Sequence, residues 1–328
     1  MSMISLAVEE TVFPLAEVFT ISRGSRTEAR VVTVTLNNGE FSGWGECVPY
    51  ARYDETVESV MDEIGSLKSA FENGIGREEL QELLKPGAAR NALDCALWDL
   101  ESKRTFTPAY AMAGLSTPNP EITAYTLSLA EPETMRAKAA EHAFRPLLKI
   151  KLGGEGDMAR LEAVREGAPK TDIIIDANEG WDADTYKELA PTLVRLGVKL
   201  VEQPLPAGDD DALGDVERVL PVCADESCHD RASLSALKGK YDMVNIKLDK
   251  TGGLTEALLL RQEAENLGFD IMVGCMVGSS LAMAPATLVA QGAAFTDLDG
   301  PLLLATDRDP PLQYDECGVY PPTSDLWG

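Results

Sequence analysis

Eight short apolar segments, spread evenly between residues 119 and 302, constrain the fold of this chain more than any other feature. They are ITAYTLSL, LLKIKLG, DIIIDAN, VKLVEQP, PVCADES, MVNIKLD, DIMVGCM and FTDLDG, and helical patterns follow them. The steps between equivalent strand ends are 25, 26, 23 and 22 residues, along Lys151, Asp176, Glu202, Asp225 and Lys247. Strands that alternate with helices form a parallel sheet, which is either closed into a barrel or open and doubly wound. Because eight units in series are the number that closes a barrel, we predict an α/β fold with a barrel over residues 119–302.

The first 118 residues follow a different pattern. Residues 3–48 read as strands, and ARVVTVTLNNGEFSGWGEC consists of an alternating run, an Asn-Asn-Gly turn and a second run, which predicts a hairpin. Residues 54–104 have apolar spacings of three and four, which predict helices. We therefore predict an α+β unit over residues 1–118, ahead of the barrel.

Composition excludes some classes of partner. The chain has 328 residues, with 54 acids against 29 bases and a formal net charge of −25. Nucleic-acid binding requires clustered positive charge, so we expect no nucleic-acid partner. No apolar run approaches the length of a membrane span and the N-terminus lacks a signal-peptide pattern, so we expect no membrane partner. The six cysteines form no CxxC pair, which favours reduced thiols in the cytoplasm.

Three carboxylates, Asp176, Glu202 and Asp225, close successive predicted strands. The C-terminal strand ends of a barrel meet at one face, and neighbouring strands lie about 5 Å apart, so these side chains should converge. A single carboxylate at such a position is commonly a helix N-cap, but three that converge repel one another unless a cation lies between them. Oxygen ligands without His or Cys favour a hard ion. We predict a Mg²⁺ site, with Mn²⁺ as the alternative ion.

Two lysines on one predicted strand are the second unusual feature. Lys149 and Lys151 of LLKIKLGG point to the same side of their strand, and Lys247 on the sixth strand faces them across the carboxylates. Removing a proton from the carbon next to a carboxylate requires a base and stabilisation of the enediolate, which a lysine of lowered pKa and a metal ion can supply. Lysines on opposite faces of one planar intermediate favour racemisation or epimerisation. The alternative is that they only pair with the carboxylates in a buried ion network.

These residues resemble the enolase superfamily, specifically its muconate-lactonizing-enzyme subgroup. The resemblance rests on KIK, on the acids that close strands three to five and on NIKLDKTGG, and it spans nearly the whole chain. It implies a modified (β/α)7β barrel that is capped by residues 1–118, with residues 303–328 returning to that cap. The mandelate-racemase subgroup uses a histidine base late in the barrel, and neither His142 nor His229 fits that position.

The resemblance also implies roles for the polar residues at the strand ends. The implied metal ligands are Asp176, Glu202 and Asp225. The implied acid/base pair is Lys151 and Lys247, with Lys149 as an electrostatic helper.

Substrate recognition is implied by narrower resemblances within the subgroup. FTDLDGP resembles the motif by which dipeptide epimerases hold a free α-ammonium group, which implies that role for Asp297 and Asp299; loop capping is the alternative. ISRGSRTEARVV resembles the mobile loop of Ala-Glu epimerases, whose arginine pairs with the glutamate side chain. By position this arginine is Arg26, and Arg23 is the competing choice. The other predicted substrate-binding residues are Tyr50, Thr126, Cys275 and Met276.

The activity implied by the resemblance is that of an isomerase with a small dipeptide as its partner. It would interconvert L-Ala-D-Glu and L-Ala-L-Glu with Mg²⁺ and two lysines, in the recycling of murein peptides. Alternatives in the same subgroup are another dipeptide specificity, N-acylamino-acid racemase and o-succinylbenzoate synthase. Whether the protein forms a homo-oligomer is left open.

Two alternatives come from other classes of protein. Gly154, Gly156 and Ala159 in GGEGDMA fit GxGxxA after a strand, with Asp176 about twenty residues on, as in a dinucleotide-binding site of a NAD-dependent oxidoreductase. Against it, the preceding strand carries two lysines and Asp176 already belongs to the three-acid set. The second alternative, a non-catalytic binding protein on a barrel, is disfavoured by the intact metal ligands and lysines.

Overall fold

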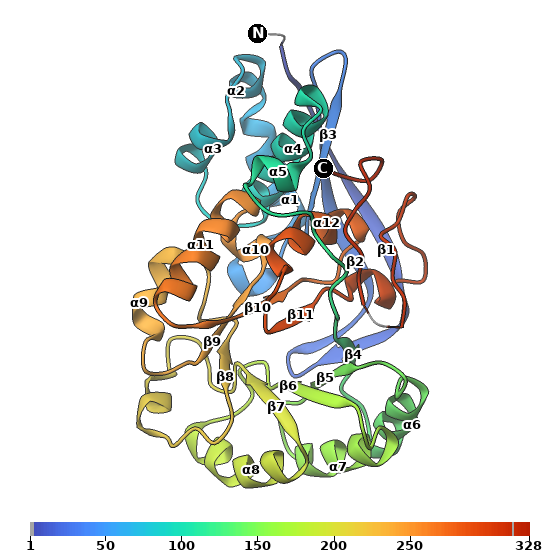
Figure 1. The fold of residues 1–328 in the computed structure, drawn as a ribbon, viewed down its shortest axis with the longest axis vertical. Helices are drawn as coiled ribbons and strands as arrows, with labels where there is room; N and C mark the ends of the chain where they lie inside the picture. The colour runs from blue at the N-terminus through green and yellow to red at the C-terminus, as the bar shows by residue number, and fades with distance from the viewer. Residues whose placement is uncertain (1–2, 317) are drawn as a thin grey trace.

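The computed structural model describes residues 3–316 and 318–328, which form an N-terminal α+β unit and a parallel barrel. Figure 1 shows the N-terminal unit in the upper half of the view and the barrel in the lower half. The antiparallel sheet of the N-terminal unit has the order β1-β2-β3, with β1 (Ser5–Ile21), β2 (Gly24–Asn37) and β3 (Ser42–Cys47). The predicted hairpin is confirmed, since β2 pairs antiparallel with β3 around the Asn-Asn-Gly turn.

The helices of the N-terminal unit are centred on α4, which lies between the sheet and the barrel. They are α1 (Val57–Ser66), α2 (Lys68–Glu72), α3 (Arg77–Leu83), α4 (Ala88–Thr105) and α5 (Ala109–Met112). A Cβ on Gly45 of β3 would lie 2.0 Å from the carbonyl oxygen of Ala92, so only glycine lets β3 approach α4 this closely. The C-terminal segment also reaches α4, because Trp327 Nε1 donates to the Cys95 carbonyl at 3.0 Å.

The barrel has eight parallel strands in chain order, as predicted, which excludes the open doubly wound sheet. They are β4 (Tyr125–Leu127), β5 (Leu147–Lys151), β6 (Asp172–Asp176), β7 (Val198–Glu202), β8 (Val222–Ala224), β9 (Met243–Ile246), β10 (Asp270–Gly274) and β11 (Phe295–Asp297). The first and last strands come together where the Ala124 N–H donates to the Thr296 carbonyl at 2.8 Å. The barrel is therefore nearly closed.

Helices cover the outside of the barrel, with one exception to the expected alternation (Figure 1). They are α6 (Pro132–Glu141), α7 (Asp157–Gly167), α8 (Ala183–Arg195), α9 (Leu234–Leu237), α10 (Leu248–Thr251), α11 (Leu254–Asn266) and α12 (Ser280–Ala290). The expectation of a helix after every strand is wrong between β7 and β8, where the fully described chain forms only the short 3₁₀ helix η2 (Asp211–Asp215). PLPAGDDDALGD is rich in proline, glycine and aspartate and lacks helical apolar spacing. The other 3₁₀ helices are η1 (Ala51–Tyr53), η3 (Arg231–Ser233) and η4 (Gly300–Leu303).

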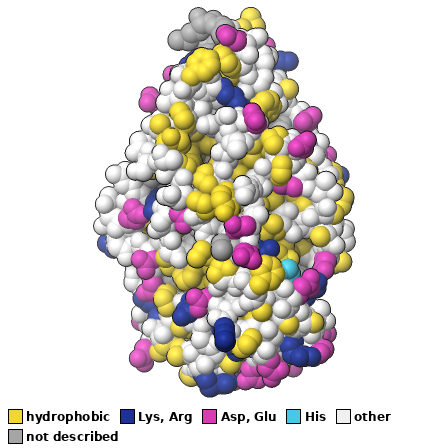
Figure 2. All heavy atoms as spheres, turned by 45° about the vertical axis from the view of Figure 1, so that its right-hand side comes forward, with side chains coloured by type: hydrophobic (Ala, Val, Ile, Leu, Met, Phe, Trp, Pro, Cys, Tyr) yellow, Lys and Arg dark blue, Asp and Glu magenta, His cyan; other side chains and the backbone are white. Residues whose placement is uncertain are grey.

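The surface carries charges of both signs. On the face shown in Figure 2, the Lys and Arg side chains lie scattered among Asp and Glu side chains. Positive charge therefore does not gather into one patch on this face. Among the described residues, none of the helices is both long and apolar enough to cross a membrane.

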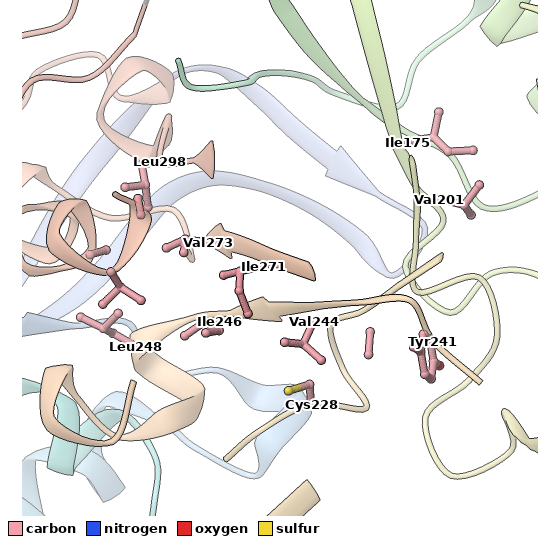
Figure 3. Packing of buried hydrophobic residues seen from close by; sticks show 14 of the residues in the cluster. Ile175, Val201, Cys228, Tyr241, Val244, Ile246, Leu248, Ile271, Val273 and Leu298 are labelled. Atoms are coloured by element: carbon pink, nitrogen blue, oxygen red, sulfur yellow. The ribbon is translucent and has the colours of Figure 1, made fainter. Parts of the chain in front are cut away.

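Alternate residues of the barrel strands point outward to the helices or inward to the barrel axis. Figure 3 shows part of the outward set, which includes Ile175, Val201, Val244, Ile246 and Ile271. The inward residues near the N-terminal strand ends form a separate apolar cluster, which we call the apolar layer: Ala124, Leu147, Ile174, Leu200, Cys223, Met243 and Met272. Above it lies what we call the polar layer: Lys149, Lys151, Asp176, Glu202, Asp225, Lys247, Asp297 and Asp299.

Candidate active site

The three predicted metal ligands meet at the C-terminal ends of neighbouring strands. Asp176 and Glu202 end β6 and β7 and are opposite each other in the parallel ladder, and Asp225 directly follows β8. One oxygen from each lies within 4.8 Å of the others, and all three side chains are buried. The Asp225 N–H donates to Gln203 Oε1 at 2.9 Å, which fixes the backbone at the third ligand. We call Asp176, Glu202 and Asp225 the acid row.

The two predicted acid/base lysines lie at opposite ends of the acid row. Lys151 Nζ on β5 is 2.6 Å from Asp176 Oδ2. Lys247, which follows β9, has its Nζ 2.6 Å from Asp225 Oδ2. Because β6, β7 and β8 separate their strands, the two ammonium groups approach the space above the acid row from opposite sides.

Lys149 links the acid row to the predicted ammonium-binding pair. Its Nζ lies 2.6 Å from Glu202 Oε2, 2.7 Å from Asp297 Oδ2 and 3.2 Å from Asp176 Oδ2. Burial by itself would lower the pKa of Lys149, but the charges of Asp297, Glu202 and Asp176 hold that pKa well above its ordinary value. Lys149 therefore stays positively charged within the polar layer.

Sequence reasoning missed a fourth lysine, Lys250. Its fully buried Nζ donates to Asp225 Oδ1 at 2.6 Å and to the Asn245 carbonyl at 2.9 Å. Burial by itself would raise the pKa of Asp225, but Lys247 and Lys250 hold that pKa well below its ordinary value. The sequence did contain a signal for Lys250, because it follows Lys247 by three residues in NIKLDK. On the single helical turn α10, this spacing brings the Lys250 side chain back to the strand end.

The acid row is short of positive charge at its centre. Burial and the charge of Asp176 raise the pKa of Glu202 to about 7, although Lys149 opposes this. Without a cation, the acid row therefore holds a proton near neutral pH. A divalent cation could take the place of that proton, since three carboxylates form the kind of oxygen donor set that such ions prefer.

Asp297 and Asp299 form a buried acidic pair beside the acid row. Asp297 ends β11, and its Oδ1 is buried without a hydrogen-bond partner among the described residues. Asp299 Oδ2 accepts a hydrogen bond from the Thr126 N–H at 2.6 Å. Burial and the charge of Asp297 raise the pKa of Asp299 to about 7. A substrate cation at this position would relieve both the repulsion and the unpaired oxygen.

A cavity lies over the polar layer, between the barrel and the β1–β2 hairpin. It is lined by every predicted substrate-binding residue and by the three predicted lysines: Arg26, Tyr50, Thr126, Cys275, Met276, Asp297, Asp299, Lys149, Lys151 and Lys247. Asp225 also reaches the cavity, whereas Asp176 and Glu202 are not among its lining residues. The cavity is also lined by residues for which no substrate-binding role was predicted, which are Phe19, Ile21, Asn178, Glu226, Val277 and Leu303.

The two competing arginines of the hairpin have different surroundings. Arg23 is paired with Glu226 at 2.8 Å and with Glu179 at 3.2 Å. Arg26 pairs across the hairpin with Phe19, and its guanidinium carbon lies 5.9 Å from the centre of the Tyr50 ring. Within the described part of the chain, no carboxylate lies within ion-pair distance of Arg26. Arg26 is therefore the arginine whose charge remains available to a ligand in the cavity.

The GGEGDMA segment does not present a phosphate site. Asp157 Oδ2 accepts hydrogen bonds from the Gly153 N–H at 2.9 Å and the Gly154 N–H at 2.8 Å. It also accepts one from Trp181 Nε1 at 2.9 Å. The backbone donors that a pyrophosphate would need are thus occupied by a carboxylate of the same loop, which argues against the dinucleotide-binding alternative.

The fold and the site together define a capped α/β barrel with an acid row between two lysines. A family model described as the mandelate racemase / muconate lactonizing enzyme N-terminal domain matches residues 3–114, and one described as enolase C-terminal domain-like matches residues 133–321. The chain belongs to this family of the enolase superfamily. The predicted fold and superfamily are confirmed, and the predicted boundary at residue 118 falls between the two matched ranges.

Curated relatives include racemases and epimerases. The chain is 48% identical to the L-Ala-D/L-Glu epimerase of Escherichia coli, over 94% of this chain and 97% of that protein. It is 45% identical to the N-acetyl-D-glutamate racemase of a Pseudoalteromonas species, over 91% of this chain and 95% of that protein. Racemases and epimerases are isomerases, so the predicted enzyme class is confirmed.

Solved structures of similar proteins contain dipeptides. An enolase family member from Agrobacterium tumefaciens with homology to dipeptide epimerases, bound to sodium and L-Ala-L-Glu with an ordered loop, is 56% identical with a TM-score of 0.97. That match covers 99% of this chain and 100% of the other. The dipeptide epimerase from Enterococcus faecalis complexed with Mg and L-Leu-L-Tyr is 29% identical with a TM-score of 0.89, and the match covers 98% of each chain.

Proposed function

We propose that this protein is a Mg²⁺-dependent dipeptide epimerase that interconverts L-Ala-D-Glu and L-Ala-L-Glu. The observation that carries the proposal is a pair of lysines at opposite ends of one buried acid row, each 2.6 Å from its carboxylate. The similarity to an epimerase of this name and to a structure that holds L-Ala-L-Glu supports the choice of substrate.

The residues of the acid row fit a hard divalent cation. They offer only carboxylate oxygens, and burial and the charge of Asp176 raise the pKa of Glu202, which supports a cation at the centre of the row. When bound there, Mg²⁺ would supply positive charge that stabilises the enediolate of the substrate and lowers the pKa of nearby lysines. The magnesium in the Enterococcus faecalis structure supports this choice of ion.

Proton transfer would be carried out by Lys151 and Lys247. A neutral lysine on one side of the substrate takes the α-proton of the glutamate residue, and the ammonium group on the other side returns a proton to the opposite face. In the reverse direction the two lysines exchange roles. Lys149, which keeps its charge, provides a fixed positive group beneath the developing negative charge.

Substrate recognition would use the two charged ends of the cavity. Asp297 and Asp299 would bind the α-ammonium of the alanine residue, and Arg26 would bind the γ-carboxylate of the glutamate residue. An N-acylated amino acid lacks this ammonium group and would leave Asp297 Oδ1 without a partner. For this reason we place the N-acylamino-acid racemase activity second, although one curated relative has an activity of that kind.

We also propose a place for the reaction in the cell. L-Ala-D-Glu is part of murein peptides, so the enzyme would recycle them in the cytoplasm. We retain a homo-oligomer as a prediction, which light scattering coupled to size-exclusion chromatography would test.

The first experiment is proton NMR in D₂O with enzyme, Mg²⁺ and L-Ala-D-Glu. We expect the glutamate α-proton signal to disappear while the L-Ala-L-Glu diastereomer accumulates, and EDTA to stop both changes. A spectrum that stays unchanged with Mg²⁺ present would reject this substrate. A panel of other dipeptides and N-acyl amino acids would then identify the one whose α-proton exchanges.

A further inference from the structure

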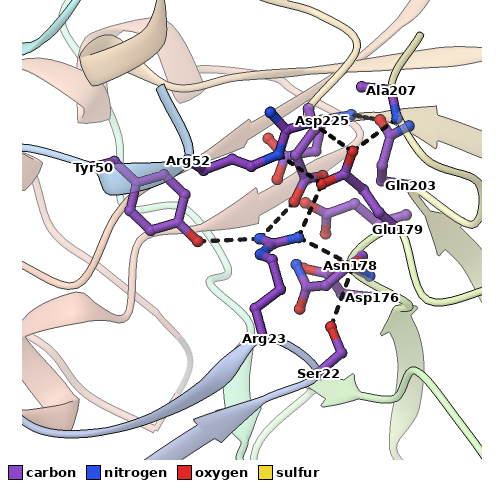
Figure 4. Close-up of polar contacts among 12 residues, drawn as sticks. Ser22, Arg23, Tyr50, Arg52, Asp176, Asn178, Glu179, Gln203, Ala207 and Asp225 are labelled. Atoms are coloured by element: carbon purple, nitrogen blue, oxygen red, sulfur yellow. Dashed lines mark hydrogen bonds and ion pairs between the residues drawn. The ribbon is translucent and has the colours of Figure 1, made fainter. Parts of the chain in front are cut away.

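One arginine at the tip of the β1–β2 hairpin connects four separate segments of the chain. Arg23 lies in the short turn between Ile21 and Gly24, over the cavity. Its Nη2 donates to the Tyr50 hydroxyl at 3.0 Å and to Glu226 Oε1 at 2.8 Å. Its Nη1 donates to the Asn178 carbonyl at 3.0 Å (Figure 4). Tyr50 belongs to the cap, whereas the two other partners lie on the barrel rim after β6 and β8.

Glu179 ties a second arginine to the same part of the rim. Its carboxylate accepts from Arg52 Nε at 3.0 Å and from Arg52 Nη2 at 2.8 Å, and it pairs with Arg23 at 3.2 Å (Figure 4). Its Oε1 also accepts a hydrogen bond from the Ala207 N–H at 2.7 Å, which connects the loop after β7 to Glu179. We call Arg23, Arg52, Glu179 and Glu226 the arginine clasp.

The rim segment held by the clasp has an unusual backbone and touches the acid row. Asn178 and Glu179 have φ values of 46° and 64°, in the left-handed region that residues other than glycine rarely adopt. The Asn178 N–H donates to Asp176 Oδ1 at 2.9 Å. A strained conformation persists only where its surroundings hold it, and the hydrogen bonds to Arg23, Arg52 and Ala207 add to the one that the Glu179 N–H donates to the Gln203 carbonyl at 2.9 Å.

We propose that Arg23 is a positioning residue that keeps the cavity closed, by fastening both cap segments to the barrel rim, and that it does not bind the substrate. Its guanidinium already satisfies Glu226, Glu179, Tyr50 and the Asn178 carbonyl, whereas Arg26 has no carboxylate partner among the residues described. Arg23, Tyr50 and Glu226 line the same cavity as the three lysines, so loosening the clasp changes the walls of that cavity. The kinetic part of this proposal rests on the proposed epimerase function.

The kinetic test compares Arg23→Ala with Arg26→Ala on L-Ala-L-Glu and on the neutral isostere L-Ala-L-Gln. The apparent affinity falls with the fraction of closed enzyme, so we expect Arg23→Ala to raise KM about tenfold for both dipeptides and to leave kcat within about threefold. Arg26→Ala should raise KM for L-Ala-L-Glu alone. Arg30→Ala, which removes an exposed arginine of β2 paired with Glu10, is the matched control and should change neither constant. If Arg23→Ala raised KM for L-Ala-L-Glu and not for L-Ala-L-Gln, the proposal would be overturned.

Two further variants test whether the clasp depends on the positive charge of Arg23 or on the arrangement of its hydrogen-bond donors. Arg23→Lys keeps the charge but cannot reach four acceptors at once, so it should resemble Arg23→Ala. In Arg23→Ala, the buried carboxylate of Glu226 loses its partner; adding Glu226→Gln should recover part of the rise in KM. If Glu226→Gln raised KM in the Arg23→Ala background as much as it does in the wild-type protein, the two residues would be independent and the pairing would be contradicted.

Hydrogen exchange tests the clasp without any assumption about activity. In the ligand-free protein, we expect faster amide exchange in Arg23→Ala within residues 21–27 and 49–54, and no change in Arg30→Ala. The hairpin is also anchored before its tip, where the Leu129 N–H donates to the Thr20 carbonyl at 2.9 Å, so exchange outside the tip should stay unchanged. Unchanged exchange in both ranges would overturn the clasp. If the wild-type protein turned over neither dipeptide, the proposed function would fail, and exchange would still decide this inference.

Discussion

On β6, β7 and β8, the apolar layer and the polar layer inside the barrel are separated by a single step of two residues. On β6, Ile174 belongs to the apolar layer and Asp176 to the polar layer. The same step leads from Leu200 to Glu202 on β7 and from Cys223 to Asp225 at the end of β8. Since residues two apart on a strand share one face, the barrel interior changes from apolar to polar within one step on each of these three strands.

The apolar layer stabilises the folded barrel, whereas the polar layer lowers its stability. Removing the apolar layer from water is favourable at roughly 25 cal/mol per Å² of apolar surface. Burying carboxylates is unfavourable, as the rise in the pKa of Glu202 to about 7 indicates. The polar layer therefore costs stability and contains the residues proposed for catalysis, and variants in the two layers should have opposite consequences for activity and stability.

Substitutions in the polar layer should change activity more than any other substitution proposed for this protein. Lys151→Ala should reduce epimerisation in both directions by about 10⁴-fold, the upper range for the loss of a general base or acid. Proton NMR in D₂O with L-Ala-D-Glu and with L-Ala-L-Glu measures both directions. Lys199→Ala, on the outward side of β7 with its side chain 51% exposed, is the control and should keep full turnover. Full turnover in Lys151→Ala would mean that the two-lysine mechanism is wrong.

The apolar layer should show the opposite behaviour. Leu200→Ala, at a fully buried position, should lower the free energy of unfolding by about 2–5 kcal/mol because it leaves a cavity. At temperatures where the variant is folded, kcat should stay within a few-fold of wild type. Urea unfolding followed by circular dichroism measures the loss, with Leu259→Ala on the exposed side of α11 as control. If Leu200→Ala lost activity while keeping its stability, the separation of the two layers would not hold.

The two layers could be predicted from the sequence, whereas the contacts between the cap and the barrel could not. The apolar segments and their polar ends depend only on local strand periodicity, which is why the eight strands and the inward direction of Lys149 and Lys151 were predictable. The arginine clasp joins Arg23 to Glu226, which are 203 positions apart, and therefore depends on how the cap sits on the barrel. Lys250 was missed for a local reason, since its direction depends on the single helical turn of α10 after the strand.

A smaller effect should come from the metal. With Mg²⁺ at 100 times its dissociation constant, the free energy of unfolding should exceed that in EDTA by about 2.7 kcal/mol, because the ion binds only the folded acid row. Asp225→Asn should abolish this gain, whereas Asp184→Asn on the exposed surface of α8 should keep it. Urea titrations with and without Mg²⁺ make the comparison. If Mg²⁺ still raised the free energy of unfolding of Asp225→Asn, the ion would bind outside the acid row, and the polar layer would not be its site.

The smallest effect per measured step is a change of slope with pH, and it separates burial from catalysis because it concerns a buried carboxylate outside the polar layer. Asp249 Oδ1 accepts from the Val48 N–H at 3.0 Å and from Asn91 Nδ2 at 2.8 Å, at the joint between cap and barrel. Burial raises its pKa to about 7, against about 3.9 in the unfolded chain. Between these values the folded protein binds a proton that the unfolded chain does not bind, so stability falls as pH rises from about 4 to about 7.

Asp249→Asn should therefore reduce this decline in metal-free protein, by at most about 1.4 kcal/mol per pH unit. Free energies of unfolding in urea at pH 5, 6, 7 and 8, with EDTA present, give the slopes, and Asp184→Asn is again the control. Glu202 and Asp299 have pKa values near 7 for the same reason and should retain part of the decline in the variant. An unaltered slope in Asp249→Asn would assign the whole pH dependence to the polar layer, and the cost of burying carboxylates would then be confined to the residues proposed for catalysis.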